Sequence, residues 1–228
     1  MGAALQTAPG RPACGPAGPR NGAAVAWRNA AFTAMVGALL AGIMPPARAQ
    51  CAPAAPVTGL GTCIDSMAGN SARVTRQING LGYRLHYGPA SYTDYELKRI
   101  YIQAYDCRQV DTTGLYARAA IVAHELGHAE YGMRQDTRSR AAFIESACDS
   151  EGHAVINNIL ARAETLQCSA QSMDIGLAAS NAGQLLDIHR ARSADRRRIG
   201  EAFCQSNFTS TTRQNYRDYY GAYYDAHY

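Results

Sequence analysis

The sequence predicts an α+β fold that is mainly helical, with a small sheet near the front of the folded part. Segments of helical periodicity occupy most of the chain after residue 111, whereas the strongest strand pattern lies before it. Hydrophobic residues make up 47% of the 228 residues, which is enough to bury a core. This composition excludes a wholly disordered chain.

The first 49 residues predict export. Arg28 precedes an apolar stretch over 30–44, which ends at two prolines and the triplet Ala-Arg-Ala at 47–49. A positive flank, an apolar centre and a small-x-small exit are typical of a secretory signal peptide. We therefore expect cleavage after Ala49 and a periplasmic or extracellular location. The part before Arg28 is long for such a signal, which leaves an over-extended start open.

The cysteine count agrees with export. An even number of cysteines in an exported chain indicates disulfides. The nearest pair in sequence, Cys51 and Cys63, is a candidate bridge, and the other pairings stay open. The sequence has no Cys-x-x-Cys, so a thiolate zinc ribbon is not indicated. The six cysteines that follow the leader are Cys51, Cys63, Cys107, Cys148, Cys168 and Cys204.

Charge and hydropathy limit the classes of partner that we expect the protein to bind. The chain has 22 basic and 18 acidic residues, and the leader holds four arginines and no acid. The remainder is therefore neutral, so we expect no nucleic-acid partner. No apolar run approaches the roughly 20 residues that span a bilayer, so we expect no stable membrane insertion.

The front of the folded part predicts one helix and two strands. Two apolar residues four apart predict a helix over 67–79, which ends at two glycines. A short strand is expected at 84–87. The best strand is 97–105, because it is rich in β-branched and aromatic residues and places Ile100 and Ile102 on one face.

The rest predicts helices over 114–131, 139–166, 173–206 and 211–226. We expect one domain over 50–210, followed by a tyrosine-rich C-terminal helix over 211–228. Its tyrosines recur at three- and four-residue steps, which favours a last helix docked on the domain; a glycan- or partner-binding surface is the alternative. They are Tyr216, Tyr219, Tyr220, Tyr223 and Tyr224.

Residues 124–128 read His-Glu-Leu-Gly-His, an H-E-x-x-H motif on a predicted helix. Because residues four apart share a helix face, His124 and His128 can bind one metal ion. Glu125 is offset by about 100° of turn, where its carboxylate can reach a water at the metal. Zinc acidifies such a water, and the carboxylate accepts its proton. Glu125 is therefore the expected general base of a zinc hydrolase.

A catalytic zinc site needs a third protein ligand and an open position. The extended motif with a third histidine six residues on is excluded, because Arg134 stands there. The following helix offers Glu145, which we expect to be the third ligand, since a turn and an antiparallel helix fit between it and the motif. Glu151 and His153 remain as rivals. Asp149 lies four residues after Glu145 and can accept the outer N–H of a ligating histidine, which we expect to be His124.

His-Glu-Leu-Gly-His followed by Glu-Ser-Ala-Cys-Asp resembles the gluzincin group of zinc metallopeptidases, whose pattern is H-E-x-x-H and then E-x-x-x-D on the next helix. The resemblance covers 97–156 and implies a zincin-like core. It also implies that the strand 97–105 pairs with an extended peptide substrate. The chain departs from these relatives at Cys148, where they often have alanine. The implied roles are zinc ligand for His124, His128 and Glu145, general base for Glu125, and a hydrogen bond to a ligand for Asp149.

The leading expectation is therefore a secreted or periplasmic zinc endopeptidase that hydrolyses protein or the peptide cross-links of a cell wall. The alternative is a non-catalytic exported binding module with a structural zinc and a Tyr/Arg surface, to which the basic run 190–198 contributes. The donor to the oxyanion stays open among His153, His189 and several tyrosines.

Overall fold

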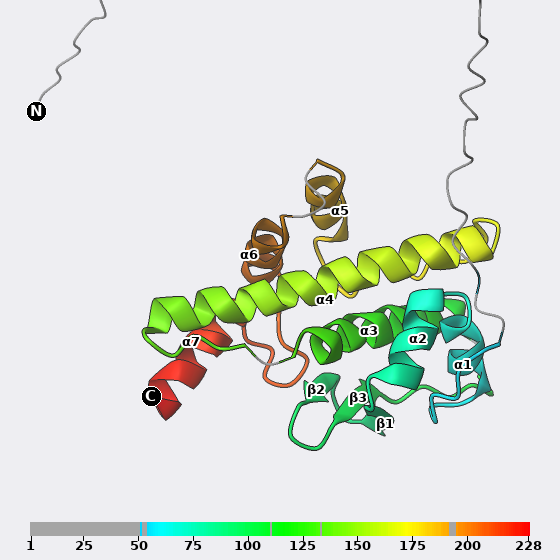
Figure 1. The fold of residues 1–228 in the computed structure, drawn as a ribbon, viewed down its shortest axis with the longest axis horizontal. Coiled ribbons are helices and arrows are strands. Elements are labelled where there is room, and N and C mark those ends of the chain that lie inside the picture. The colour runs from blue at the N-terminus through cyan, green and yellow to red at the C-terminus, as the bar shows by residue number, and fades with distance from the viewer. Residues whose placement is uncertain (1–50, 52–53, 110, 133, 192–194) are drawn as a thin grey trace, which may run out of the picture. The chain divides into compact units, whose positions relative to one another are not determined.

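Two long helices lie side by side and antiparallel, and they position most of the other elements (Figure 1). They are α3 (Thr112–Tyr131) and α4 (Arg140–Cys168). Asp111 caps the first, since its carboxylate accepts from the backbone N–H groups of Thr113 and Gly114. Ser139 caps the second in the same way. The computed structural model describes residues 51, 54–109, 111–132, 134–191 and 195–228.

The two helices approach closely because a glycine lies at their contact. A Cβ atom on Gly127 would lie 2.7 Å from the Cα atom of Ala154 and 2.8 Å from the Cβ atom of Asn157. Asn157 adds a hydrogen bond across the contact, from its side-chain amide to the backbone carbonyl of Ala123 at 2.6 Å. This contact sets which residues of α4 face α3.

The sheet has three strands, β1 (Arg84–Gly88), β2 (Tyr92–Asp94) and β3 (Arg99–Gln103). Their order is β1-β3-β2, so β3 is central, parallel to β1 and antiparallel to β2. Both expected strands are present: the strand expected over 84–87 is β1, and the strand expected over 97–105 is the shorter β3. The strand β2 was not predicted. The fold is thus α+β and mainly helical, as expected.

The main core fills the space between the sheet, α3 and two short helices. These are α1 (Thr62–Ala68) and α2 (Ala72–Gly80), where one helix over 67–79 was expected. Ser71 begins the second, because its hydroxyl accepts from the N–H of Val74. The core residues include Ile64, Val74, Leu85, Ile100, Ile102, Val122 and Leu126.

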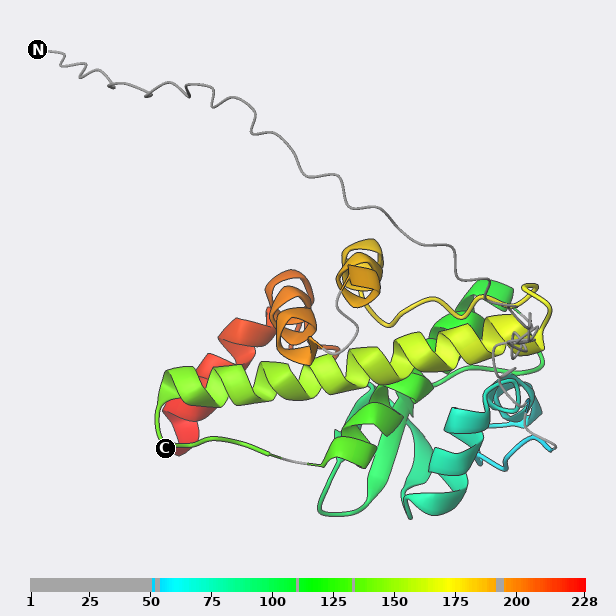
Figure 2. The same ribbon diagram turned by 45° about the horizontal axis from the view of Figure 1, so that its top comes forward.

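Three further helices pack on α4 (Figure 2). They are α5 (Ala182–Ala191), α6 (Arg196–Ser206) and α7 (Tyr216–His227). Glycines again allow close contact: a Cβ on Gly152 would collide with the Arg196 carbonyl, and one on Gly200 with the Cys148 carbonyl. Where one helical stretch was expected over 173–206, the structure has two helices. The last helix begins later than predicted.

The C-terminal helix α7 is docked, as the leading expectation had it. Phe143 of α4 stacks with Tyr223 at a centroid distance of 5.8 Å and also contacts Tyr224. Arg140 forms an ion pair with Asp225 at 3.0 Å. Gly221 lies directly under the Arg140 guanidinium, where a Cβ atom would collide with it.

Three disulfides connect the six cysteines: Cys51–Cys168, Cys63–Cys107 and Cys148–Cys204. The candidate bridge Cys51–Cys63 is therefore wrong, and each of its members joins a distant segment. Disulfides of this number fit a protein of an oxidising compartment. Within the described ranges, no helix is long and apolar enough to cross a membrane. The expected export signal over 1–49 lies outside the described residues.

Candidate metal centre

Three side chains from the two long helices converge on one point. His124 and His128 project from one face of α3, and Glu151 reaches them from α4. One carboxylate oxygen, Glu151 Oε2, lies 3.2 Å from His124 Nε2 and 3.4 Å from His128 Nε2. The three side chains each offer a ligand atom, and these atoms lie within 4.8 Å of one another.

The spacing of these atoms fits a metal ion. Ligand atoms about 2.0–2.2 Å from a tetrahedral ion lie roughly 3.3–3.6 Å apart, close to the two distances found here. Two imidazoles and one carboxylate are a donor set found in catalytic metal sites, where the fourth position stays open. The described residues supply only these three donors to the cluster. The group is therefore suited to hold a metal ion with a position left for another molecule.

Neighbouring hydroxyls orient two of the three donors. Ser150 Oγ lies 3.1 Å from His128 Nδ1, which leaves Nε2 of that ring to face the cluster. The phenol of Tyr220 donates to Glu151 Oε1, which leaves Oε2 to face the histidines. His124 differs, because its Nδ1 is buried with no hydrogen-bond partner among the described residues. Its ring stacks instead on Phe203, at a centroid distance of 5.4 Å.

The charges of the cluster keep its carboxylate ionised. Burial is the largest influence on the pKa of Glu151 and raises it, but the charge of His128 and the hydrogen bonds from both histidines outweigh it, so the pKa falls below its ordinary value. Burial lowers the pKa of His128, but the charge and hydrogen bond of Glu151 and the charge of Glu125 raise it overall. An ionised carboxylate is the form that binds a cation.

Glu125 lies beside the cluster and is held by the sheet. It is buried, with 7% of its surface exposed. The Thr93 hydroxyl, from β2, lies 2.8 Å from Glu125 Oε2 and 3.1 Å from the Glu125 backbone carbonyl. Oε1 of Glu125 makes no hydrogen bond within the part of the chain that the structure describes.

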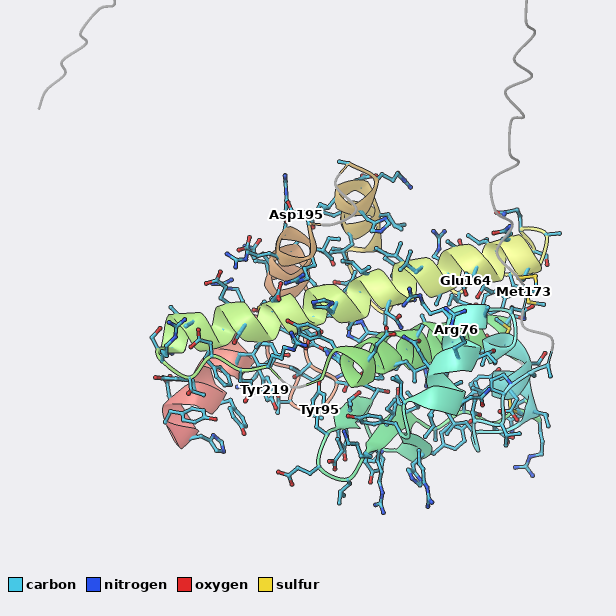
Figure 3. All side chains as sticks on the ribbon, in the orientation of Figure 1. Arg76, Tyr95, Glu164, Met173, Asp195 and Tyr219 are labelled. Atoms are coloured by element: carbon cyan, nitrogen blue, oxygen red, sulfur yellow. A yellow bond between two sulfur atoms is a disulfide. The ribbon has the colours of Figure 1, made fainter. Side chains whose placement is uncertain are left out.

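The cluster borders a cavity of about 500 Å³ between the sheet edge and the C-terminal segment. Figure 3 labels Tyr95, which follows β2, and Tyr219 of α7, which both line this cavity. Glu125, His128 and Glu151 share the cavity with many hydroxyl groups. The hydroxyl-bearing residues are Ser91, Tyr92, Thr93, Tyr95, Ser150, Thr209, Ser210, Thr211, Thr212, Tyr216, Tyr219 and Tyr220.

Three of these phenols stay protonated. Burial raises the pKa of Tyr95, and the charges of Glu125 and Glu151 raise it further. Burial raises the pKa of Tyr216 well above its ordinary value, with Glu151 and Glu125 adding, and the pKa of Tyr220 is raised in the same way by burial and Glu151. These phenols are therefore hydrogen-bond donors at neutral pH.

The structure does not bring Glu145 to the histidines, so our expectation for the third ligand is corrected to its rival Glu151. The Glu145 side chain is half exposed and forms an ion pair with Arg197 of α6 at 2.8 Å. The physical reason is the rotation of α4. Cys148 and Gly152 face α6, and Glu145 and Glu151 lie about 120° apart around the helix.

Asp149 and His153 are not at the cluster either. Asp149 lies 3.1 Å from Arg196 Nε and accepts from the Tyr131 hydroxyl at 3.2 Å, so it does not bond to His124 as expected. His153 stacks on Tyr131 at a centroid distance of 3.6 Å. Neither His153 nor His189 lines the cavity. Among the candidates for the oxyanion donor, only tyrosines line the cavity.

The expected substrate strand also needs correction. The central strand β3 has β1 on one side and β2 on the other, and β2 already pairs with Arg99, Ile100 and Tyr101, so that stretch of β3 cannot pair with an added strand. Of the two outer strands, β2 lines the cavity. Its start is engaged by Ser210, whose hydroxyl donates to the backbone carbonyl of Ser91 at 2.8 Å and accepts from the Ser91 N–H at 3.3 Å.

The role of Tyr220 escaped prediction because it lies 69 residues from Glu151 in sequence. The helical spacing of the tyrosines predicted a shared face, but a spacing does not show what the face contacts.

Comparison of the chain with protein-family models, with curated proteins and with solved structures found no match.

Proposed function

We propose that the protein is an exported zinc-dependent endopeptidase of the gluzincin type, with His124, His128 and Glu151 as zinc ligands and Glu125 as general base. One observation supports this most: three donors converge, and two of them, His128 and Glu151, line the same cavity as the buried Glu125. A structural zinc site is closed by four protein ligands, whereas this donor set has three and adjoins a cavity. The geometry therefore favours catalysis over the non-catalytic alternative.

Each residue of the proposed site has a distinct chemical role. Zinc, when bound, would act as a Lewis acid toward a peptide carbonyl and promote ionisation of water near neutral pH. Glu125 is placed to accept a proton at Oε1, because Thr93 occupies Oε2. The same carboxyl group can return that proton to the leaving amine. Tyr95 and Tyr216 are protonated donors that can stabilise the oxyanion.

We infer that the substrate is a peptide held in a hydroxyl-rich cavity. Hydroxyl groups of β2, of 209–212 and of the α7 tyrosines can donate to or accept from backbone amides. Protein and cell-wall cross-links both offer such amides. The three disulfides and the predicted signal agree with action outside the cytoplasm.

The decisive experiment measures zinc content and hydrolysis together in the purified protein and in Glu125→Gln. We expect about one zinc per chain in both, cleavage of a quenched fluorescent casein or of isolated cell-wall sacculi by the unchanged protein, and at least about a 100-fold lower rate in the variant. A chelator should abolish the activity, and added zinc should restore it.

Glu130→Gln is the matched control. Glu130 lies on the same helix but outside the cavity, where it bonds to Arg73 and Gln77. This variant should keep both zinc and activity. A chain without zinc, or full activity in Glu125→Gln, would overturn the proposal. Zinc without hydrolysis of either substrate would favour the structural-zinc alternative.

A further inference from the structure

We propose that the C-terminal helix α7 is part of the metal centre, with Tyr220 as a positioning residue for Glu151, so that metal binding and docking of α7 stabilise each other. This inference rests on the proposed metal site and adds a partner within the chain. It concerns a helix that contributes no ligand.

One carboxylate serves both elements. Glu151 presents Oε2 to His124 and His128, and its Oε1 accepts from the Tyr220 phenol. The Glu151 side chain is only 3% exposed, so water cannot readily replace that phenol. The phenol therefore fixes the rotation of the carboxylate and leaves one defined oxygen for the metal.

The C-terminal part of α7 is anchored by contacts that do not involve the cluster. Arg140 pairs with Asp225 at 3.0 Å, and Phe143 packs against Tyr223 and Tyr224. These contacts lie at the N-terminal end of α4 and touch none of the three donors. They position the helix, and the helix positions Tyr220.

The hydrogen bond between Tyr220 and Glu151 exists only when α7 is docked, so it couples docking of α7 to metal binding. If docking of α7 orders Glu151 and so raises metal affinity, metal binding must favour docking by the same factor, because coupling between two equilibria is reciprocal. Two consequences can be measured. Changes in α7 should weaken metal binding, and metal should protect α7.

The experiment titrates zinc against a competing chromophoric chelator in the full chain and in three variants. Tyr220→Phe should bind zinc about 10–100-fold more weakly, as expected when a group that orients a ligand is lost. Tyr223→Phe is the matched control, because Tyr223 lies on the same helix but does not line the cavity. Its affinity should change by less than about twofold.

Asp225→Asn tests the coupling without touching the site. It removes an ion pair with Arg140 that is half exposed on both sides, and should lower zinc affinity about two- to threefold. The Co²⁺-loaded form separates the two roles, since its visible absorption reports ligand geometry. The spectrum should change in Tyr220→Phe and stay unchanged in Asp225→Asn. Hydrogen exchange over 216–227 should slow when zinc is added to the unchanged protein.

The outcomes are distinguishable. No zinc binding by the unchanged chain would overturn both this inference and the proposed function. Zinc binding that is equally tight in Tyr220→Phe and Asp225→Asn would overturn this inference alone. If Tyr220→Phe does not fold, Asp225→Asn and hydrogen exchange in the unchanged chain decide: unchanged affinity and unchanged exchange would overturn it.

Discussion

The hydroxyl of Thr93 connects the sheet to α3, because it lies 2.8 Å from the carboxylate and 3.1 Å from the backbone carbonyl of Glu125 and can donate its one proton to either. A single edge-strand residue thereby orients the proposed general base. Helix α3 carries both the proposed base and two of the proposed ligands, but the hydroxyls that orient the side chains come from different elements: β2 for Glu125, α4 for His128 and α7 for Glu151.

We predict that Thr93→Val will slow hydrolysis without loss of zinc. Valine has nearly the same shape but removes the donor from Glu125 Oε2, so the carboxylate loses its fixed orientation. We expect a roughly 10-fold lower kcat with an unchanged zinc content. Thr93→Ser, which keeps the hydroxyl, should restore most of the rate. Equal loss of rate in both variants would show that packing, not the hydrogen bond, matters.

We predict that Glu151→Gln and Glu145→Gln will differ sharply in zinc affinity. The first removes the anionic ligand and should weaken binding by 100-fold or more, since a neutral amide oxygen is a poorer zinc ligand. The second removes an exposed ion pair with Arg197 and should change affinity by less than about twofold. The measurement is the same chelator competition. The reverse order would return the third ligand to Glu145.

We predict that Gly127→Ala will destabilise the protein. Its new Cβ would lie 2.7 Å from the backbone of Ala154, which cannot move aside as a flexible side chain would. Forcing α3 from α4 should cost about 1–3 kcal/mol in the free energy of unfolding, measured with urea. Gly183→Ala is the control, because nothing lies within 4 Å of its new Cβ. That variant should not lower the unfolding free energy.

We predict a pH-dependent contribution from Asp174. Hydrogen bonding from Arg162 lowers the pKa of Asp174, against the opposing effect of burial. A lowered folded-state pKa means stabilisation that is present above the unfolded-state pKa of about 3.9 and is lost as pH falls through the folded-state pKa. Asp174→Asn should therefore lower the unfolding free energy at pH 7 and much less near pH 2.

The size of this effect is limited by solvent. The Asp174 side chain is 46% exposed, so we expect about 0.5 kcal/mol or less at pH 7. Asp187→Asn removes a pair that is exposed on both sides and should change stability less. A constant deficit of Asp174→Asn across the pH range would contradict the assignment.

The sequence alone was enough for the parts of the site that depend on local spacing. Two histidines four apart must share a helix face, and the adjacent glutamate follows from the same geometry. The helix of 114–131 was expected nearly at its observed bounds, because Thr112 or Thr113 could cap its start; the observed cap is Asp111. The fold class followed in the same way from periodicity.

The third donor of the cluster depends on a helix rotation that no local pattern contains. Glu145 and Glu151 were both acceptable by distance along the chain. The choice is made by long-range contacts, namely the Cys148–Cys204 bridge and the Gly152–Arg196 contact, which turn one face of α4 toward α6. The edge strand β2 was missed because three residues are too few for a periodic signal.

The distance in sequence between Glu151 and Tyr220 has a consequence for biogenesis. A chain is synthesised from its N-terminus, so the histidines and Thr93 exist well before α7, and Glu151 precedes its phenol partner by 69 residues. Until that last helix docks, the cavity lacks a wall and one carboxylate oxygen lacks its donor. The proposed peptidase would thus acquire its complete centre only after its last helix has docked.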